Sequence, residues 1–337
     1  MPDNDNLLKD WKTETQFLRN PMIKALLALF AVILIGVIFN GDGAFFKWTT
    51  HRDMLRQSSV FGILACGMTL VIITAGIDLS VGSILGFSAV LFAILTIHRD
   101  WSAWLAIPAC IAAGALLGSV SGGFISRFRI QPFIATLAMM VFARGVAKFI
   151  SGGMKISTYI KKPDGGYIYK PEPEIFHLID SRILSDNIAM VSIIFIVCLV
   201  VSWLTLSRLR VGRYLFAIGG NQEAARLSGV PVSLSRIFAY AMSGAMSAIA
   251  GICQAAQEYQ GDPEAGQTYE LTAIAMVVIG GTNLMGGKGG VILTLFGVLI
   301  IGYLDKILSI NAVGEASRLM FQGAVIIVAV LIQRSKK

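Results

Sequence analysis

Few residues in this 337-residue sequence could do chemistry, and the first is an aspartate between two apolar runs. Asp78 lies in the segment TAGIDLSVGS at 74–83, two residues before Ser80. A carboxylate facing lipid at the middle of a membrane helix would cost about 2.5–3.5 kcal/mol, so its presence needs a reason. Two interpretations stay open: Asp78 caps the following helix by accepting hydrogen bonds from free N–H groups, or it lines a transport path.

Other polar side chains at membrane depth offer hydrogen-bonding groups rather than nucleophiles. Gln131 precedes Pro132 at a predicted helix start, and two amides lie near the end of a later apolar run. Amides and carboxylates bond the hydroxyls of sugars, but the same side chains also cap helices at an interface, so both roles stay open. The candidates for a substrate path are Asp78, Ser80, Gln131, Gln254, Gln257, Glu270 and Asn283.

Two pairs of charged residues have simpler explanations. Arg144 and Lys148 lie four residues apart near one end of a predicted helix, where long side chains reach the interface by snorkelling. Glu315 and Arg318 are three residues apart and are expected to pair with each other. Neither pair predicts a functional site.

The sequence predicts no enzyme and no metal site. The stretch TNLMGGKGG at 282–290 comes nearest to a phosphate-binding loop, but Thr282 stands where that motif needs glycine, and Gly289 follows Lys288 in place of serine or threonine. No nucleophile, base and orienting group occur together. We therefore expect this chain to bind no cofactor. Four cysteines lie singly in apolar runs and are predicted to be buried free thiols: Cys66, Cys110, Cys198 and Cys253.

The segment GRYLFAIGGNQEAARLSGVP at 212–231 predicts a short helix outside the membrane. A pair of glycines breaks the chain, Asn221 caps a helix over 222–227, and Gly229 with Pro231 ends it. From the residues alone, docking to another protein and resting on lipid headgroups are equally favoured. The candidate docking residues are Gly219, Gly220, Asn221, Glu223, Ala224, Ala225, Arg226, Ser228 and Gly229.

The composition shows what kind of element must position these residues. Hydrophobic residues make up 55% of the chain and charged residues 14%, whereas a soluble domain carries about 25% charged residues. The net charge is +8, and the positive residues gather in a few loops, as in membrane proteins that keep cations on the cytoplasmic side. The chain is thus predicted to be an integral membrane protein with lipid around it and no nucleic-acid partner.

Hydrophobic runs predict an all-α, polytopic fold of about ten transmembrane helices. A membrane-spanning helix needs about 20 apolar residues. The eighth run is cleanly apolar only over 271–281, so we expect a broken or re-entrant helix there. The segments AGIDLSVG at 75–82 and GGTNLMGG at 280–287 echo each other, which leaves a pseudo-repeat of two halves open. The ten runs are 22–40, 57–75, 79–97, 102–125, 132–150, 188–206, 236–257, 269–285, 290–308 and 316–333.

Loop charges orient these helices. Arginines gather in the 207–235 loop, so that side, together with both chain ends, is predicted to be cytoplasmic. The 151–187 loop balances its charges and is predicted to lie outside; the 41–56 loop should also be external but is basic. The predicted division is a single transmembrane domain over 22–333 with cytosolic tails at 1–21 and 334–337.

Several of these stretches, in this order, resemble the permease subunits of bacterial ABC importers for monosaccharides of the ribose, xylose, arabinose and galactoside type. Chain length and helix number fit the same family, and together the motifs are highly specific. The matching stretches are GIDLSVGS at 76–83, QPFIATL at 131–137, FAIGGNQEAARLSGV at 216–230, YEL at 269–271, GGT at 280–282 and GG at 286–287.

The resemblance implies a transport subunit of the inner membrane that performs no chemistry itself. Two permease copies, or one copy and a paralogous permease, would form the path for a monosaccharide or related small polyol. A cytosolic ABC ATPase carrying ATP–Mg would dock below, and a periplasmic sugar-binding protein would deliver substrate above. The family's coupling helix falls on 219–230, which favours docking over lipid contact for that segment.

Two features depart from the family pattern, and one alternative function stays open. The 151–187 loop is long and charged, and Met285 and Lys288 vary the glycine-rich motif. The alternative is an ion-coupled secondary transporter of a small polar solute, which would need intramembrane carboxylates such as Asp78 or Glu270. Uptake driven by an ion gradient, without any ATPase, would distinguish it from an importer.

Overall fold

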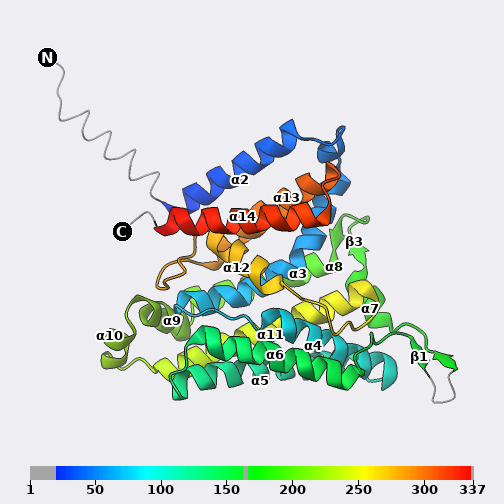
Figure 1. Ribbon diagram of the computed structural model, residues 1–337, viewed down its shortest axis with the longest axis horizontal. Helices are drawn as coiled ribbons and strands as arrows, with labels where there is room; N and C mark the ends of the chain where they lie inside the picture. The colour runs from blue at the N-terminus through cyan, green and yellow to red at the C-terminus, as the bar shows by residue number, and fades with distance from the viewer. Residues whose placement is uncertain (1–19, 162–165, 335–337) are drawn as a thin grey trace.

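The computed structural model describes residues 20–161 and 166–334 (Figure 1). Nearly all of the predicted tails at 1–21 and 334–337 lie outside these residues. The described chain is mainly helical, as predicted, and carries two small β-hairpins in addition.

Eight helices of the described residues are long and apolar enough to cross a bilayer. The shortest have 18 residues, and a helix of that length spans about 27 Å, close to the thickness of a hydrocarbon core. The chain is therefore a polytopic membrane protein. The eight helices are α2 (Pro21–Ile38), α3 (Trp48–Ile73), α4 (Val81–Ala93) with its π-helical extension η2 (Ile94–His98), α5 (Ala103–Arg127), α6 (Pro132–Ser151), α8 (Met190–Ser207), α11 (Val232–Glu258) and α13 (Val291–Ile310).

Two further helices correspond to the remaining hydrophobic runs. Helix α12 (Tyr269–Ile279) has 11 residues, so it is only about 16 Å long and cannot cross a bilayer by itself. The predicted run at 269–285 therefore ends early, because Gly280 is followed by a left-handed Gly281 at φ +112°. Helix α14 (Glu315–Arg334) follows the last predicted run closely.

Local sequence explains most helix boundaries. Pro21 and Pro132 occupy first-turn positions of α2 and α6, where a missing N–H costs nothing. Gly152 ends α6 in the left-handed conformation at φ +63°. One boundary was predicted wrongly: α3 begins at Trp48 rather than at 57, and its polar first turns occupy most of the predicted 41–56 loop.

The polar start of α3 is held by the 151–187 segment. That segment forms one hairpin from β1 (Tyr159–Lys161) and β2 (Tyr167–Tyr169), the helix α7 (Glu174–Asp180), and a second hairpin from β3 (Arg182–Ile183) and β4 (Ile188–Ala189). Arg182 pairs with Asp53 at 2.8 Å, and Arg52 pairs with Asp186 at 3.1 Å. Asp186 and Asp180, which pairs with Arg56, thus neutralise two basic residues of the predicted external 41–56 loop. We call this side of the molecule the hairpin end.

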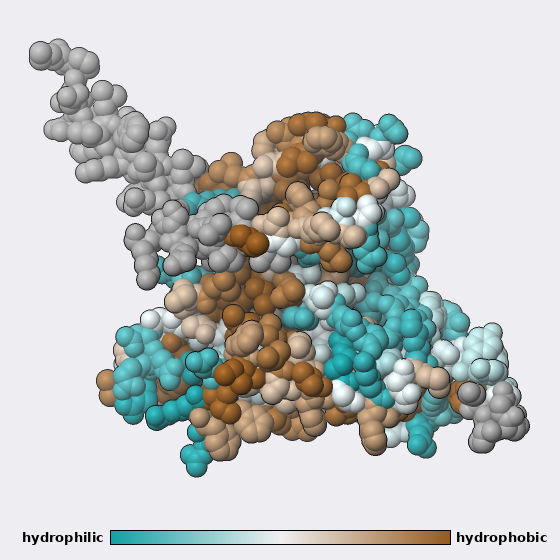
Figure 2. All heavy atoms as spheres, in the orientation of Figure 1, coloured by the Kyte–Doolittle hydropathy of each residue, from teal (hydrophilic) through white to brown (hydrophobic). Residues whose placement is uncertain are grey.

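The opposite side carries a short helix, α10 (Gln222–Leu227), and we call it the α10 end. Figure 2 shows hydrophilic residues gathered at these two ends and hydrophobic residues across the region between them. This banding is the pattern expected for a protein whose helices cross a lipid layer from one aqueous side to the other.

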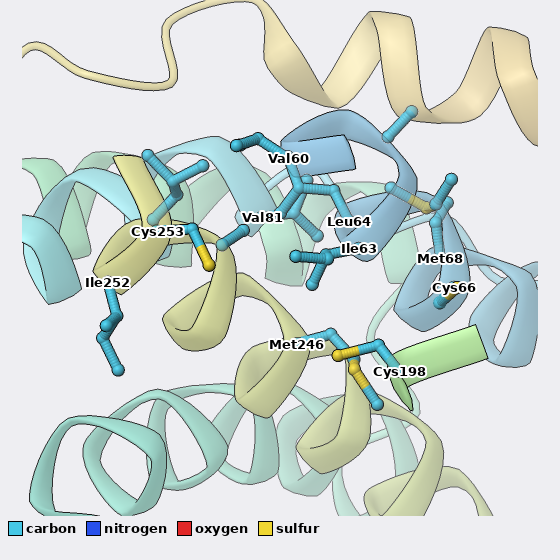
Figure 3. Close-up of a cluster of buried hydrophobic side chains, with 14 of the residues drawn as sticks. Val60, Ile63, Leu64, Cys66, Met68, Val81, Cys198, Met246, Ile252 and Cys253 are labelled. Carbon is cyan, nitrogen blue, oxygen red and sulfur yellow. The ribbon is translucent and has the colours of Figure 1, made fainter. Parts of the chain in front are cut away.

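Helix α3 forms the centre of the fold. In its apolar 18-residue stretch, 83% of the residues are buried, compared with 17% in the corresponding stretch of α2 and 22% in that of α5. The side chains around it include sulfur-containing residues from two other helices, as Figure 3 shows for Cys198 of α8 and for Met246 and Cys253 of α11. The four cysteines are buried and free, as predicted.

Small residues let α5 and α11 approach closely. A Cβ placed on Gly118 would lie only 2.1 Å from the carbonyl oxygen of Tyr240, and one on Gly114 would lie 2.5 Å from that of Gly244. Such contacts are typical of membrane helices, which associate through backbone proximity and dispersion rather than through the hydrophobic effect.

Candidate docking site and transport path

The short helix predicted over 222–227 is present as α10. The side chain of Asn221 accepts a hydrogen bond from the N–H of Ala224 at 3.0 Å, so its predicted role as N-cap is confirmed. Arg226 donates two hydrogen bonds to the Glu223 carboxylate, at 2.6 and 3.1 Å. This pairing lowers the pKa of Glu223, so the carboxylate is ionised at neutral pH.

The surface of α10 divides its small residues between two sides. Ala224 is exposed, whereas Ala225 is only 5% exposed and packs against its own chain. Leu227 is 75% exposed and presents an apolar side chain beside Glu223 and Ala224 on the outer surface of α10. Of the predicted docking residues, Ala225 is therefore not available to a partner, while Glu223, Ala224 and Arg226 are.

A helix that was not predicted precedes α10. Helix α9 (Arg210–Gly220) includes both glycines that were expected to break the chain, and the break falls one residue later, at Asn221. Its buried residues are Gly212, Leu215 and Ile218, at intervals of three. This periodicity is the signal that could have revealed the helix.

The end of α9 meets two other interruptions of the bundle. A Cβ on Gly219 would lie 1.8 Å from the carbonyl oxygen of Ile73 and 2.5 Å from the amide nitrogen of Gly287. The same Gly287 N–H donates a hydrogen bond to Ile73 at 3.0 Å. We call this contact of 73–75, 219–220 and 286–287 the glycine junction; it joins the α10 segment to the end of α3 and to the loop before α13.

Asp78 lies in the chain between α3 and α4 and is fully buried. Its Oδ1 accepts hydrogen bonds from the backbone N–H and the hydroxyl of Ser80, at 3.0 and 2.5 Å, and its Oδ2 accepts one from Ser243 at 2.7 Å. Tyr240 donates to the carbonyl of Ile77 at 3.4 Å. Asp78 therefore bonds Ser80, the residue that precedes the first turn of α4, and does not itself cap the free N–H groups of that helix. Ser243 on α11 is a partner that the sequence did not reveal.

After α11, the chain turns back into the bundle. Gly261 lies against Ala89 on α4, the Ala265 carbonyl lies against Gly86, and Gly266 lies against Gly82. Gly82 is 16 residues from His98, the end of η2, so α12 begins about 24 Å from the hairpin end. The predicted broken helix at 269–285 thus starts deep inside the bundle.

Arg144 holds this returning segment, and the snorkelling interpretation of this residue is wrong. Its guanidinium donates to the carbonyls of Pro263 and Ala265 at 2.5 and 2.7 Å. Lys148, by contrast, is half-exposed and pairs with Glu264 at 2.5 Å. The predicted pairing of Arg318 with Glu315 is also wrong. Arg318 instead donates to Asp305, at 3.2 and 3.3 Å.

The seven candidates for a substrate path do not form one cluster. Asp78 and Ser80 are fully buried, and Gln131 is exposed at the start of α6. Gln254 donates to Glu258 near the end of α11, where Gln257 also lies half-buried. Glu270 is half-buried in the first turn of α12, with its carboxylate close to Gly82.

Asn283 has a local role in the glycine-rich loop. Its Oδ1 accepts the N–H of Met285 at 3.1 Å, and its amide donates to the Gly286 carbonyl at 3.4 Å. These bonds shape the turn that brings Gly286 and Gly287 to the glycine junction.

Comparisons with known proteins agree with this architecture. A family model described as "Branched-chain amino acid transport system / permease component" matches residues 52–330. The ribose import permease of Escherichia coli K12 is 36% identical over 93% of this chain and 94% of its own length. The fructose import permease of Bifidobacterium longum is 34% identical over 91% and 86%, and the xylose transport system permease of Escherichia coli K12 is 31% identical over 94% and 93%.

No solved structure matches the chain. An ABC permease works with an ATPase and a binding protein and does not hydrolyse ATP itself. The family match covers most of the chain, and the relatives match over more than nine-tenths of it. The chain therefore belongs to this permease family, as a multi-pass membrane component of a bacterial ABC importer.

Proposed function

We propose that this permease forms the path for a monosaccharide or related small polyol. The proposal rests on relatives named as permeases for ribose, fructose and xylose, each similar over more than 85% of its own length. In this proposal two copies, or one copy and a paralogous permease, assemble in the inner membrane. A periplasmic binding protein delivers sugar at the hairpin end, and ATP–Mg is bound only by the ATPase at the α10 end.

The proposed topology follows from this placement. Ten helical segments lie in one transmembrane domain over 22–333, with both chain ends in the cytoplasm. The 207–235 loop then faces the cytoplasm and the 151–187 loop the periplasm. Arginines in the first loop and balanced charges in the second support this orientation.

One observation carries the docking role: α10 is exposed at its surface and anchored at its base. Glu223, Ala224 and Leu227 face outward, while the adjoining end of α9 contacts Ile73 and Gly287 backbone directly. Backbone contacts of this kind leave no room for compression. A displacement of α10 by an ATPase would therefore move the end of α3 and the loop before α13.

A second connection runs through α11, which begins five residues after α10 ends. Ser243 on α11 holds Asp78 at the start of α4. Movement of the α10 segment thus has two routes to the α3–α4 interruption, one through the glycine junction and one through Asp78. We propose that ATP-driven closure of the ATPases uses these contacts to rock the permeases between outward and inward states.

The docking role is tested by charge and size changes on α10. Glu223→Arg removes the ionised carboxylate and its bonds to Arg226, and Ala224→Trp adds bulk on an exposed position where the protomer itself has space. We expect both variants to lose co-purification of the ATPase and ATP-driven sugar uptake in proteoliposomes. Thermal unfolding should stay as in the wild type.

The matched control is Glu174→Arg, the same charge reversal at an exposed position in the first turn of α7 at the hairpin end. This variant should still co-purify with the ATPase. Normal ATPase binding and normal uptake in both α10 variants would show that α10 is not the docking helix.

A further inference from the structure

A cavity of about 330 Å³ lies between α3, α12, α13 and α14. None of the substrate-path candidates derived from the sequence lines it. Its walls include Gln57 and Phe61 of α3, which lie about 14 and 20 Å along that helix from Trp48. Several lining residues, including Gln57, Gln267 and Thr268, are exposed, so the cavity is a cleft that opens to the surface of the protomer.

The lining combines aromatic rings with polar groups. Phe61 and Tyr269 lie 4.4 Å apart between ring centroids, at an angle of 42°. Gln322 donates to Thr272 at 2.7 Å, and Arg318 is held by Asp305. Ligand sites of this size are mostly apolar, with a few placed polar groups that fix orientation.

Two features show that polar groups on this wall have hydrogen-bonding capacity left over. Among the residues that the structure describes, the Nε–H of Arg318 is buried without a hydrogen-bond partner. Thr268, at the mouth of the cavity, holds a left-handed φ of +66° at the start of α12, and its side chain makes no capping bond. Strain in a non-glycine residue of this kind concentrates at functional sites.

The start of α12 places these groups at a position that suits transport. Gln267, Thr268 and Tyr269 lie where the chain, after turning back into the bundle, begins a half-length helix. Irregular backbone inside a membrane is tolerated where protein covers it or where it lines a cavity. Transporters commonly bind their substrates at such interrupted helices.

We propose that this cavity is a binding station for a monosaccharide within a single protomer. The proposal rests on the proposed sugar-import function and names the residues that contact the cargo. Gln57, Gln322 and Arg318 bond sugar hydroxyls, and the rings of Tyr269 and Phe61 pack against the C–H face of the sugar. A lipid headgroup is the competing occupant, and the experiment separates the two.

The test is protection of an introduced cysteine. Gln322→Cys places a thiol on the cavity wall of a protein whose native cysteines are buried, so the background labelling is low. The permease–ATPase complex in nanodiscs is treated with a water-soluble methanethiosulfonate reagent, with and without D-ribose, D-xylose or D-fructose. We expect at least one of these sugars to slow labelling about tenfold, as about 90% occupancy of the site would.

The matched control is Met320→Cys on the same helix, where the native side chain is 76% exposed and outside the cavity. Sugar should leave its labelling unchanged. Equal protection at both positions, or none at Gln322→Cys with any of the three sugars, would overturn the proposal. Slower labelling in nanodiscs rich in phosphatidylglycerol, without a sugar effect, would assign the cavity to lipid and overturn it too.

A second set of variants tests the contact itself. In the Gln322→Cys background, Tyr269→Ala should raise the half-protecting sugar concentration about five- to tenfold, as expected for the loss of one aromatic contact. Tyr269→Phe keeps the ring and should restore protection, and Leu271→Ala on the exposed side of α12 should have no effect. If Tyr269→Ala leaves the half-protecting sugar concentration unchanged, the ring of Tyr269 does not contact the sugar.

The outcome for sugar import itself is separable. Uptake of the same three sugars is measured in proteoliposomes with the ATPase and the binding protein. Uptake without protection would overturn the assignment of the cavity as a sugar-binding site and leave the proposed function intact. Protection without uptake of any of the three would support the cavity as a sugar site and count against the proposed function.

Discussion

Ser243 on α11 donates a hydrogen bond of 2.7 Å to Asp78, which lies 165 residues away in the chain between α3 and α4. The carboxylate accepts two further hydrogen bonds from Ser80, and all three residues are buried. A buried carboxylate is stable only when its acceptor sites are used in this way. The contact thus fixes the α3–α4 interruption against the helix that follows α10.

Removing Asp78 should destabilise the permease strongly. Asp78→Ala leaves the Ser243 hydroxyl and the Ser80 donors buried without their partner, at a cost of about 1–3 kcal/mol for each unsatisfied group. Ser243→Ala removes one bond and should cost less. Thermal unfolding in detergent, followed with a thiol-reactive dye that reads exposure of the buried cysteines, measures both changes.

Ser119→Ala is the control, because this hydroxyl bonds only the Ala115 carbonyl of its own helix at 2.7 Å. Its unfolding midpoint should stay close to that of the wild type. If Asp78→Ala unfolds at the same temperature as Ser119→Ala, the hydrogen bonds around Asp78 do not stabilise the interruption between α3 and α4.

The glycine junction predicts different effects at two adjacent glycines. Gly219→Ala would place a methyl group 1.8 Å from the Ile73 carbonyl oxygen, so the junction must open; we expect a loss of about 1–3 kcal/mol, as for other overpacked sites, and impaired uptake. At Gly220 a Cβ meets nothing within 4 Å. Gly220→Ala should therefore change stability by no more than about 0.5 kcal/mol.

Unfolding midpoints and sugar uptake, measured side by side, distinguish these two variants. Equal behaviour of Gly219→Ala and Gly220→Ala in both assays would mean that the contact of 219–220 with 73–75 does not transmit movement from α10 to α3. A Gly219→Ala variant that folds but takes up no sugar would place the junction directly in the coupling route.

Arg144 and Lys148 should respond very differently to substitution. Arg144→Lys keeps the charge but cannot reproduce the two bonds from one guanidinium to Pro263 and Ala265, and charge-assisted bonds contribute about 1.5–3 kcal/mol. Lys148→Ala removes only a half-exposed ion pair with Glu264, worth at most about 1 kcal/mol. The thermal unfolding midpoint should therefore fall further in Arg144→Lys than in Lys148→Ala.

The same pair can be followed by limited proteolysis of the 259–268 segment. We expect faster cleavage in Arg144→Lys, because the segment loses its anchor, and near-normal cleavage in Lys148→Ala. The opposite order would mean that the surface ion pair, and not the guanidinium, holds the returning chain in place.

Exposed Leu227 should contribute to docking without contributing to stability. Leu227→Asp introduces a charge at a position that is 75% exposed, so the unfolding midpoint should not change. A charge in an apolar contact with the ATPase would weaken co-purification of the complex. Retention of the ATPase at wild-type stoichiometry would exclude Leu227 from the interface.

Features that depend on neighbouring residues were readable from the sequence. Long apolar runs predicted the eight spanning helices, and the asparagine-capped α10 was placed within a residue of its observed bounds. Even here, the amphipathic helix α9 and the polar first turns of α3 were missed. Hydropathy alone favours uniformly apolar segments and overlooks helices whose polar side is paired or exposed.

Features that depend on distant contacts were not readable. Snorkelling was a reasonable expectation for Arg144, because nothing local shows that a carbonyl-bearing segment 119 residues later returns to it. Arg318 was expected to choose the nearest acid, Glu315, but it bonds Asp305 across the turn between two helices. In each case the partner is decided by helix packing, which brings together groups of large sequence separation.

The sequence by itself determined that the chain is a polytopic membrane protein, where most of its helices run, and that its informative residues interrupt them. Apolar composition and local caps suffice for this, since each acts over one or two helical turns. Only the tertiary structure joined the interruptions into one glycine junction, buried Asp78 against Ser243 and opened a cavity beside the start of α12. These arrangements depend on which helices touch, and close packing between distant segments is specified by no local pattern.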